Sequence, residues 1–171
     1  MTQENAHPHL SQLDDLERFV EAATGRVIHA VGDRERWLVF DGNTWTTAEA
    51  ATAARELALE TVRHKHAQLD EEKAKHSYAA QRLNLTYPGV LVRGAEQDPR
   101  LRKPAAEFDR EPHLLGCANG VLDLRTGELR SGQHDLWVSR STGISYNAGA
   151  GCPRWEQFLT EVLPDSDEVQ T

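Results

Sequence analysis

The chain has 171 residues, 39% of them hydrophobic, and it carries a formal net charge of −8. This length suits one domain, or one domain plus a helical extension, and the apolar content is sufficient for a core. The acidic balance argues against a general polyanion-binding surface, because non-specific affinity for DNA depends on Lys and Arg that neutralise phosphates, although a local basic patch is compatible with it.

Cysteine content and hydropathy are typical of a cytosolic protein. The two cysteines, Cys117 and Cys152, form no disulfide framework, so reduced thiols are expected. No apolar run is long enough to span a membrane, and the N-terminus lacks the basic and then apolar pattern of a secretion signal. We therefore expect a soluble, cytoplasmic protein with no membrane partner.

A helix is predicted near the N-terminus, after polar residues 1–10 that should fray. Ser11 can cap it, and Asp14 and Asp15 are placed favourably in its first turn. Apolar side chains then recur at helical spacing until Gly25 ends the helix.

A small antiparallel meander follows this helix. Strands are predicted at residues 26–31 and 36–41, around a turn at residues 32–35. The turn Asp41-Gly42-Asn43 leads into a third short strand at residues 44–46. Trp37 and Trp45 lie on this meander.

The middle of the chain is predicted to be helical. A long helix over residues 47–69 has one apolar stripe, and polar residues 70–73 break it. A second helix runs to about residue 85 and is stopped by Tyr87-Pro88-Gly89. Residues 90–92 are predicted to form a short strand, and residues 94–112 a proline-containing loop with at most one helical turn.

Residues 119–130 are the most informative stretch of the chain. An apolar run precedes the turn Arg125-Thr126-Gly127, in which Gly127 can adopt a positive φ, so a β-hairpin is predicted. Further strands are expected at residues 136–141 and 144–146. Pro153 opens a last helix, which Pro164 ends. Strands, then helices, then strands indicate an α+β fold.

Four blocks of sequence together resemble the N-terminal domain of phage, plasmid and poxvirus primase-helicases, the domain that precedes a superfamily-three helicase motor. The blocks lie at residues 36–45, 111–118, 119–130 and 145–159, in the order and spacing of that family. Residues 93–106 look like an insertion. The signature residues, expected to be structural, are Trp37, Asp41, Gly42, Trp45, Asn119, Gly120, Asp123, Leu124, Thr126, Gly127, Pro153 and Trp155.

The resemblance implies an accessory domain of a phage, prophage or plasmid replicative primase-helicase, acting in DNA replication in the bacterial cytosol. Residues 1–25 would be a polar tail and helix, and residues 26–171 the accessory domain, ending at the linker to a helicase motor that this chain lacks. The chain would then be either truncated or a stand-alone copy. The full-length parent would be a hexameric, ATP-dependent DNA helicase. Linking protomers and guiding DNA would be this domain's role.

No phosphate-binding loop of the form G-x-x-x-x-G-K-[ST] occurs in the sequence. ATP and Mg²⁺ are therefore expected only in the motor, and this chain should not hydrolyse ATP by itself. The main alternative is a stand-alone interaction module that binds a replication protein. A small metal-dependent nuclease is a third, weaker interpretation.

Catalytic residues are not expected. Asp41, Asp109 and Asp123 could be read as catalytic carboxylates. However, Asp41 is most simply a turn former, and Asp123 should face solvent or pair with Arg125 or Arg140. No G-x-S-x-G motif occurs.

A metal site is likewise not expected. His113, Cys117, His134 and Cys152 could converge on zinc, but the chain has neither a C-x-x-C pair nor an H-x₃₋₅-H pair. Surface histidines and two small buried thiols are the simpler interpretation.

DNA contacts are assigned to the densest basic stretch, at Arg93, Arg100, Arg102 and Lys103. Neighbouring carboxylates largely cancel this charge, so a solvated loop is the competing interpretation; the alternative is a loop that touches DNA phosphates or a neighbouring subunit. Tryptophans could stack on single-stranded bases, but each lies where a core anchor is expected. The four are Trp37, Trp45, Trp137 and Trp155.

Overall fold

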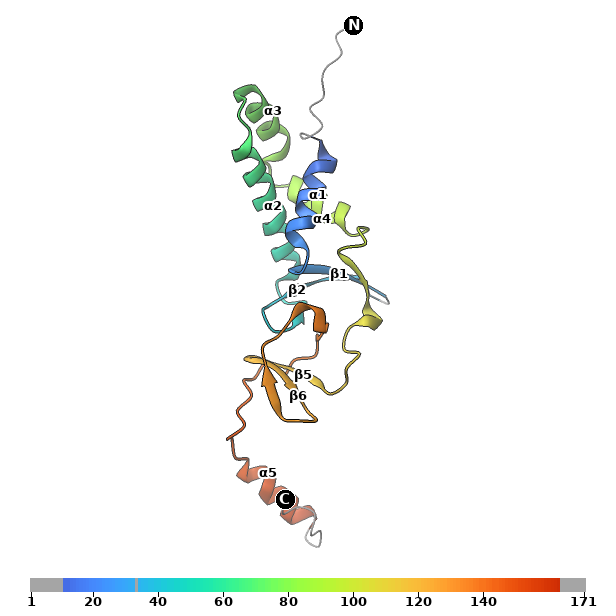
Figure 1. The fold of residues 1–171 in the computed structure, drawn as a ribbon, viewed down its shortest axis with the longest axis vertical. Coiled ribbons are helices and arrows are strands. Elements are labelled where there is room, and N and C mark those ends of the chain that lie inside the picture. Colours follow the sequence, from blue (N-terminus) through green and yellow to red (C-terminus); the bar gives the residue numbers. More distant parts are fainter. Residues whose placement is uncertain (1–10, 33, 164–171) are drawn as a thin grey trace.

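Helices occupy one end of the molecule, and two small sheets connect them to an isolated C-terminal helix (Figure 1). The computed structural model describes residues 11–32 and 34–163. The fold is α+β, as the sequence predicts. None of the helices in these ranges is long and apolar enough to cross a membrane.

Helices α1 (Gln12–Ala23), α2 (Ala50–Gln68) and α4 (Tyr87–Ala95) pack together around the main core. Helix α3 (Glu72–Arg82) follows α2 after the predicted break and packs back on it. Ser11 caps α1, because its hydroxyl accepts a hydrogen bond from the Asp14 backbone N–H at 3.1 Å. The buried side chains of this core include Phe19, Val20, Leu57, Val62, Leu91 and Leu101.

A single buried carboxylate connects helices α1 to α4. Asp15 of α1 is 0% exposed. Lys65 of α2 donates to it at 2.5 Å and Arg82 of α3 at 3.2 Å, which supplies the opposite charge. The hydroxyls of Tyr78 and Tyr87 donate at 2.9 Å and 2.7 Å. Burial, together with the nearby Asp15 charge, raises the pKa of both phenols well above the ordinary range, so both stay protonated donors.

The first sheet has the strand order β3-β2-β1-β4. Strands β1 (Val27–Val31), β2 (Arg36–Phe40) and β3 (Trp45–Thr46) are antiparallel neighbours and confirm the predicted meander. Strand β4 (Arg102–Pro104) pairs parallel to β1. The loop predicted over residues 94–112 is therefore wrong at residues 102–104. Pairing with a distant strand supplies backbone hydrogen bonds that the local sequence does not suggest.

The faces of this sheet alternate as the strand period requires. Val27 belongs to the helical core, whereas Ile28 and Ala30 pack with Leu38 and Trp45 on the opposite face. The Trp45 indole therefore anchors the side of the sheet that faces the C-terminal half of the chain.

The second sheet contains the predicted hairpin. Strands β5 (Leu114–Cys117), β6 (Gly120–Asp123) and β7 (Glu128–Arg130) are antiparallel, with Leu122 opposite both Leu115 and Leu129. Gly127 has the positive φ predicted for it, +71°, and its N–H donates to the Asp123 carbonyl at 2.8 Å.

Replacing Gly127 with valine should lower the melting temperature by several degrees, about 1–3 kcal/mol of stability. Only the Tyr146 hydroxyl lies within 4 Å of an added Cβ, at 3.8 Å, so the cost comes from backbone strain and not from a clash. Gly151→Val is the control, because Gly151 has open space and no positive φ. Equal thermal unfolding of the two variants would contradict this account of the turn.

Three predicted strand segments are wrong. Residues 90–92 lie within α4, which Pro88 helps to open instead of stopping the preceding helix. The segments 136–141 and 144–146 form no strand: a 3₁₀ turn covers His134–Leu136, and Trp137 has a left-handed φ of +52°. The chain then runs beside β5 with an isolated parallel bridge, Gly116 to Ser141.

The last helix, α5 (Pro153–Val162), projects from the second sheet at the end of the molecule opposite the helical core (Figure 1). It begins at Pro153 as predicted and contains no buried residue. The prediction that Pro164 ends it, and the predicted fraying of residues 1–10, lie outside the described residues.

Candidate functional site

The first signature block builds a turn and a core anchor. The Asp41 carboxylate accepts hydrogen bonds from the backbone N–H groups of Asn43 and Thr44 at 2.9 Å and 2.7 Å, and Gly42 has a φ of +100°. Trp45 is 1% exposed and its indole N–H donates to the His134 carbonyl at 2.8 Å. These contacts form a tight turn and bury one large aromatic side chain.

Hydrogen bonds link the first signature block to the second, and the third to the fourth. The Asn119 side chain exchanges two hydrogen bonds with the Tyr146 backbone, at 2.8 Å and 2.9 Å. The Asn43 amide donates to the Ala118 carbonyl at 3.1 Å. At Gly132, an added Cβ would lie 2.2 Å from the Asn43 Cα, so the backbones touch there. Three distant segments thus meet at one junction, formed by residues 41–45, 118–120 and 146.

The three candidate carboxylates are separate groups, of which Asp41 and Asp123 form turns and Asp109 joins two distant segments. Asp109 accepts from the Ser139 N–H at 2.7 Å, the Ser139 hydroxyl at 2.6 Å and the Arg140 N–H at 3.0 Å. Asp123 pairs with Arg125 at 3.0 Å, as predicted, and hydrogen bonds from that arginine lower the pKa of Asp123 to about 2. Asp41 and Asp123 are engaged by the turns that they form, whereas Asp109 holds the distant residues Ser139 and Arg140.

No group of three or more His, Cys, Asp or Glu side chains that could hold a metal ion is found within residues 11–32 and 34–163. Cys117 is buried and Cys152 is exposed. His113 lies 3.6 Å from Glu111, and His134 packs edge-on against Phe40.

The predicted DNA contacts lie on three successive elements. Arg93 is exposed on α4, Arg100 lies in the following turn, and Arg102 and Lys103 lie on β4. Glu17 binds Arg100 through two hydrogen bonds of 2.5 Å and 2.7 Å.

Most of this positive charge is paired. Arg100 also contacts Asp98 at 2.8 Å, and its hydrogen bonds lower the pKa of that carboxyl. Lys103 contacts Glu107 at 2.7 Å and lies 3.8 Å above the Trp137 ring. Arg102 donates to Gln97. Arg93 is therefore the most available cation of the four.

The tryptophans divide into core and surface. Trp45 and Trp137 stack with ring centroids 5.5 Å apart, and Trp37 is half-buried against the helical core. Trp155 is the exception to the predicted core role, because it is 54% exposed on α5, where it stacks on Phe158.

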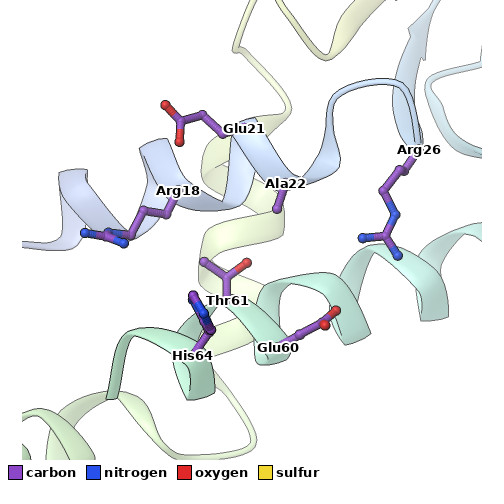
Figure 2. Close-up of a pocket in the computed structure, with 7 residues that line it drawn as sticks. All are labelled: Arg18, Glu21, Ala22, Arg26, Glu60, Thr61 and His64. Atoms are coloured by element: carbon purple, nitrogen blue, oxygen red, sulfur yellow. The ribbon is translucent and has the colours of Figure 1, made fainter. Parts of the chain in front are cut away.

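A cavity of about 520 Å³ opens between α1 and α2 (Figure 2). Figure 2 shows the Arg26 side chain extending toward Glu60 of α2, whereas Glu21 points away from α2. Arg18 at its edge already binds Asp14 at 3.1 Å. With two arginines and two glutamates in the lining, the cavity has no preference for one sign of charge. Only the tertiary structure shows it, because its residues follow no motif.

Comparison with known families agrees with this description of the molecule. A protein family described as "D5 N terminal like" matches residues 17–164 of the chain. No curated protein matches the chain. The family match spans most of the 171 residues, so the chain belongs to the D5 N-terminal-like family, the N-terminal domain of phage and plasmid primase-helicases.

Proposed function

We propose that this chain is an accessory domain of a phage or plasmid replicative primase-helicase, with an assembly and DNA-guiding role. The observation that carries the proposal is the family membership over residues 17–164. It is supported by signature residues such as Asp41, Asn119 and Gly127, whose contacts build turns and a junction between segments. In this proposal ATP and Mg²⁺ bind to the motor of the full-length protein.

The charge distribution supports guidance of DNA by weak contacts instead of tight binding of DNA. The net charge is −8, and carboxylates pair with Arg100 and Lys103. Each phosphate contact made by these side chains would have to replace an ion pair within the domain. High local concentration in an assembled full-length protein would compensate for a weak contact.

The purified chain should bind single-stranded DNA only weakly, at roughly micromolar Kd or worse at physiological salt, with affinity falling steeply as salt rises. Replacing Arg100, Arg102 and Lys103 with alanine should weaken binding and reduce the salt slope by about one for each phosphate that the variant no longer neutralises. Fluorescence anisotropy with a labelled oligonucleotide measures both quantities.

The matched control replaces Arg34, Arg63 and Lys73, which are exposed elsewhere, with alanine and changes the net charge equally. If both triple variants bind alike, the predicted residues make no DNA contact of their own. If the parent chain does not bind at low salt, DNA guidance is not a property of this domain.

The alternative is a stand-alone module that binds a replication protein. The exposed apolar residues of α5 favour a protein contact in either case. The coding sequence beyond codon 171 distinguishes the two: an in-frame phosphate-binding loop with its lysine supports the helicase parent.

A further inference from the structure

Large exposed apolar side chains gather in two places on the described part of the chain. The first is α5, where Trp155, Phe158 and Val162 are 54%, 48% and 56% exposed. With half-buried Leu159 they follow the i, i+3, i+4, i+7 spacing of one helical face. We call these four residues the α5 face. Contiguous apolar surface of this kind indicates a contact site.

The second place is concave. Two adjoining cavities of about 270 Å³ and 570 Å³ share Arg55 and Leu85 and lie between α2 and α4. We call them together the α2–α4 groove. Leu85 is 88% exposed and Val90 53% exposed. The main lining residues are Arg55, Leu59, Leu85, Pro88, Val90 and Arg93.

The groove has a formed wall. The Arg55 guanidinium donates to the Leu85 carbonyl at 3.0 Å, which holds the segment after α3 against α2. Pro88 is buried at the start of α4. A groove with an ordered wall can receive a helix with little rearrangement, which favours affinity.

The two surfaces also have complementary charge. Glu156 borders one edge of the α5 face, and Arg154 and Glu161 border the other, so the helix is net negative. The groove carries Arg55 and Arg93. Glu56 at the edge of the groove cancels one of these two positive charges, so the groove remains net positive.

A chain cannot easily fill its own groove. Figure 1 shows α5 at the end of the molecule opposite α2 and α4, with both sheets between them. A second copy presents the missing partner for each surface.

We propose that the α5 face of one copy docks in the α2–α4 groove of a second copy. The contact is heterologous, so a pair of copies keeps one unused α5 face and one unused groove, and repetition gives rings or open chains. The inference rests on the proposed function, which gives the reason for copies of the chain to assemble. Its test uses this chain alone, without DNA or a motor, so a failure of the DNA-guiding role leaves the test unaffected.

Sedimentation velocity over a range of concentrations tests the contact on the whole chain. The parent chain should associate with increasing concentration. Phe158→Asp and Leu85→Asp should each weaken self-association by about tenfold or more, since placing a charge in an apolar contact costs at least the equivalent of one decade in Kd. Leu13→Asp, at a residue 76% exposed outside both surfaces, is the control and should associate like the parent chain.

Mixing is the decisive measurement. The Phe158→Asp chain has an intact groove and the Leu85→Asp chain an intact α5 face, so the mixture should form a 1:1 dimer that grows no further. A parent chain that stays monomeric, a Leu85→Asp chain that still self-associates, or a mixture that stays monomeric would each overturn the proposal. Val162→Asp and Val90→Asp form a second pair if circular dichroism shows that a first variant is misfolded.

Discussion

Replacing Asp15 with alanine should lower the free energy of unfolding by about 3–5 kcal/mol, the cost of breaking a buried ion pair from one side. The side chain of Lys65 is 4% exposed and would lose a partner at 2.5 Å. Two tyrosine hydroxyls and the Arg82 guanidinium would lose an acceptor as well. Urea unfolding followed by circular dichroism measures the change.

Asp14→Ala is the matched control for Asp15. Asp14 precedes Asp15 on the same helix and also contacts Lys65, at 2.6 Å, but its side chain is 30% exposed. Its loss should cost only about 0–1 kcal/mol, because solvent screens the exposed carboxylate. Equal losses for the two variants would show that burial of Asp15 is not the source of its effect.

Replacing Gly120 with alanine should be the most damaging change in the signature hairpin. An added Cβ would lie 2.4 Å from the Arg130 carbonyl oxygen, which belongs to the backbone of β7 and cannot move aside alone. The expected cost is about 1–3 kcal/mol for the forced shift of the strand, with about 1–2 kcal/mol more for the φ of +151°.

Gly42→Ala separates these two costs. Gly42 has a φ of +100° but nothing within 4 Å of an added Cβ, so only backbone strain should appear there. The difference between the two variants in thermal unfolding reports the clash against β7. If Gly42→Ala is as damaging as Gly120→Ala, the close approach of the two strands contributes nothing.

Local sequence signals predict the elements that have local causes. The limits of α1, the break before Glu72 and the hairpin turn at Gly127 are confirmed, because a capping serine, a polar run and a glycine act within a few residues. The strand predicted at residues 90–92 is wrong because a short apolar run fits a strand and a buried helix equally well. The buried positions of Leu91 and Ala95 in α4 decide the outcome.

Features made by distant segments could not be predicted. The four donors to Asp15 lie 50 to 72 positions along the chain. In the sequence, Asp15 is an ordinary residue of the first helical turn. The pairing of β4 with β1 has the same origin. The resemblance gives the signature residues as a set, but only the structure shows that Asn43 and Asn119 form one junction.

That junction limits which pieces of the domain can be exchanged between relatives. The Asn43 amide reaches Ala118, Asn119 reaches Tyr146, and Gly132 leaves room only for the backbone of Asn43. A chimera that takes the hairpin from one protein and the Asp41 turn from another would join surfaces that have not changed together. To keep this junction, the Asp41 turn, the hairpin and Tyr146 must therefore be exchanged together.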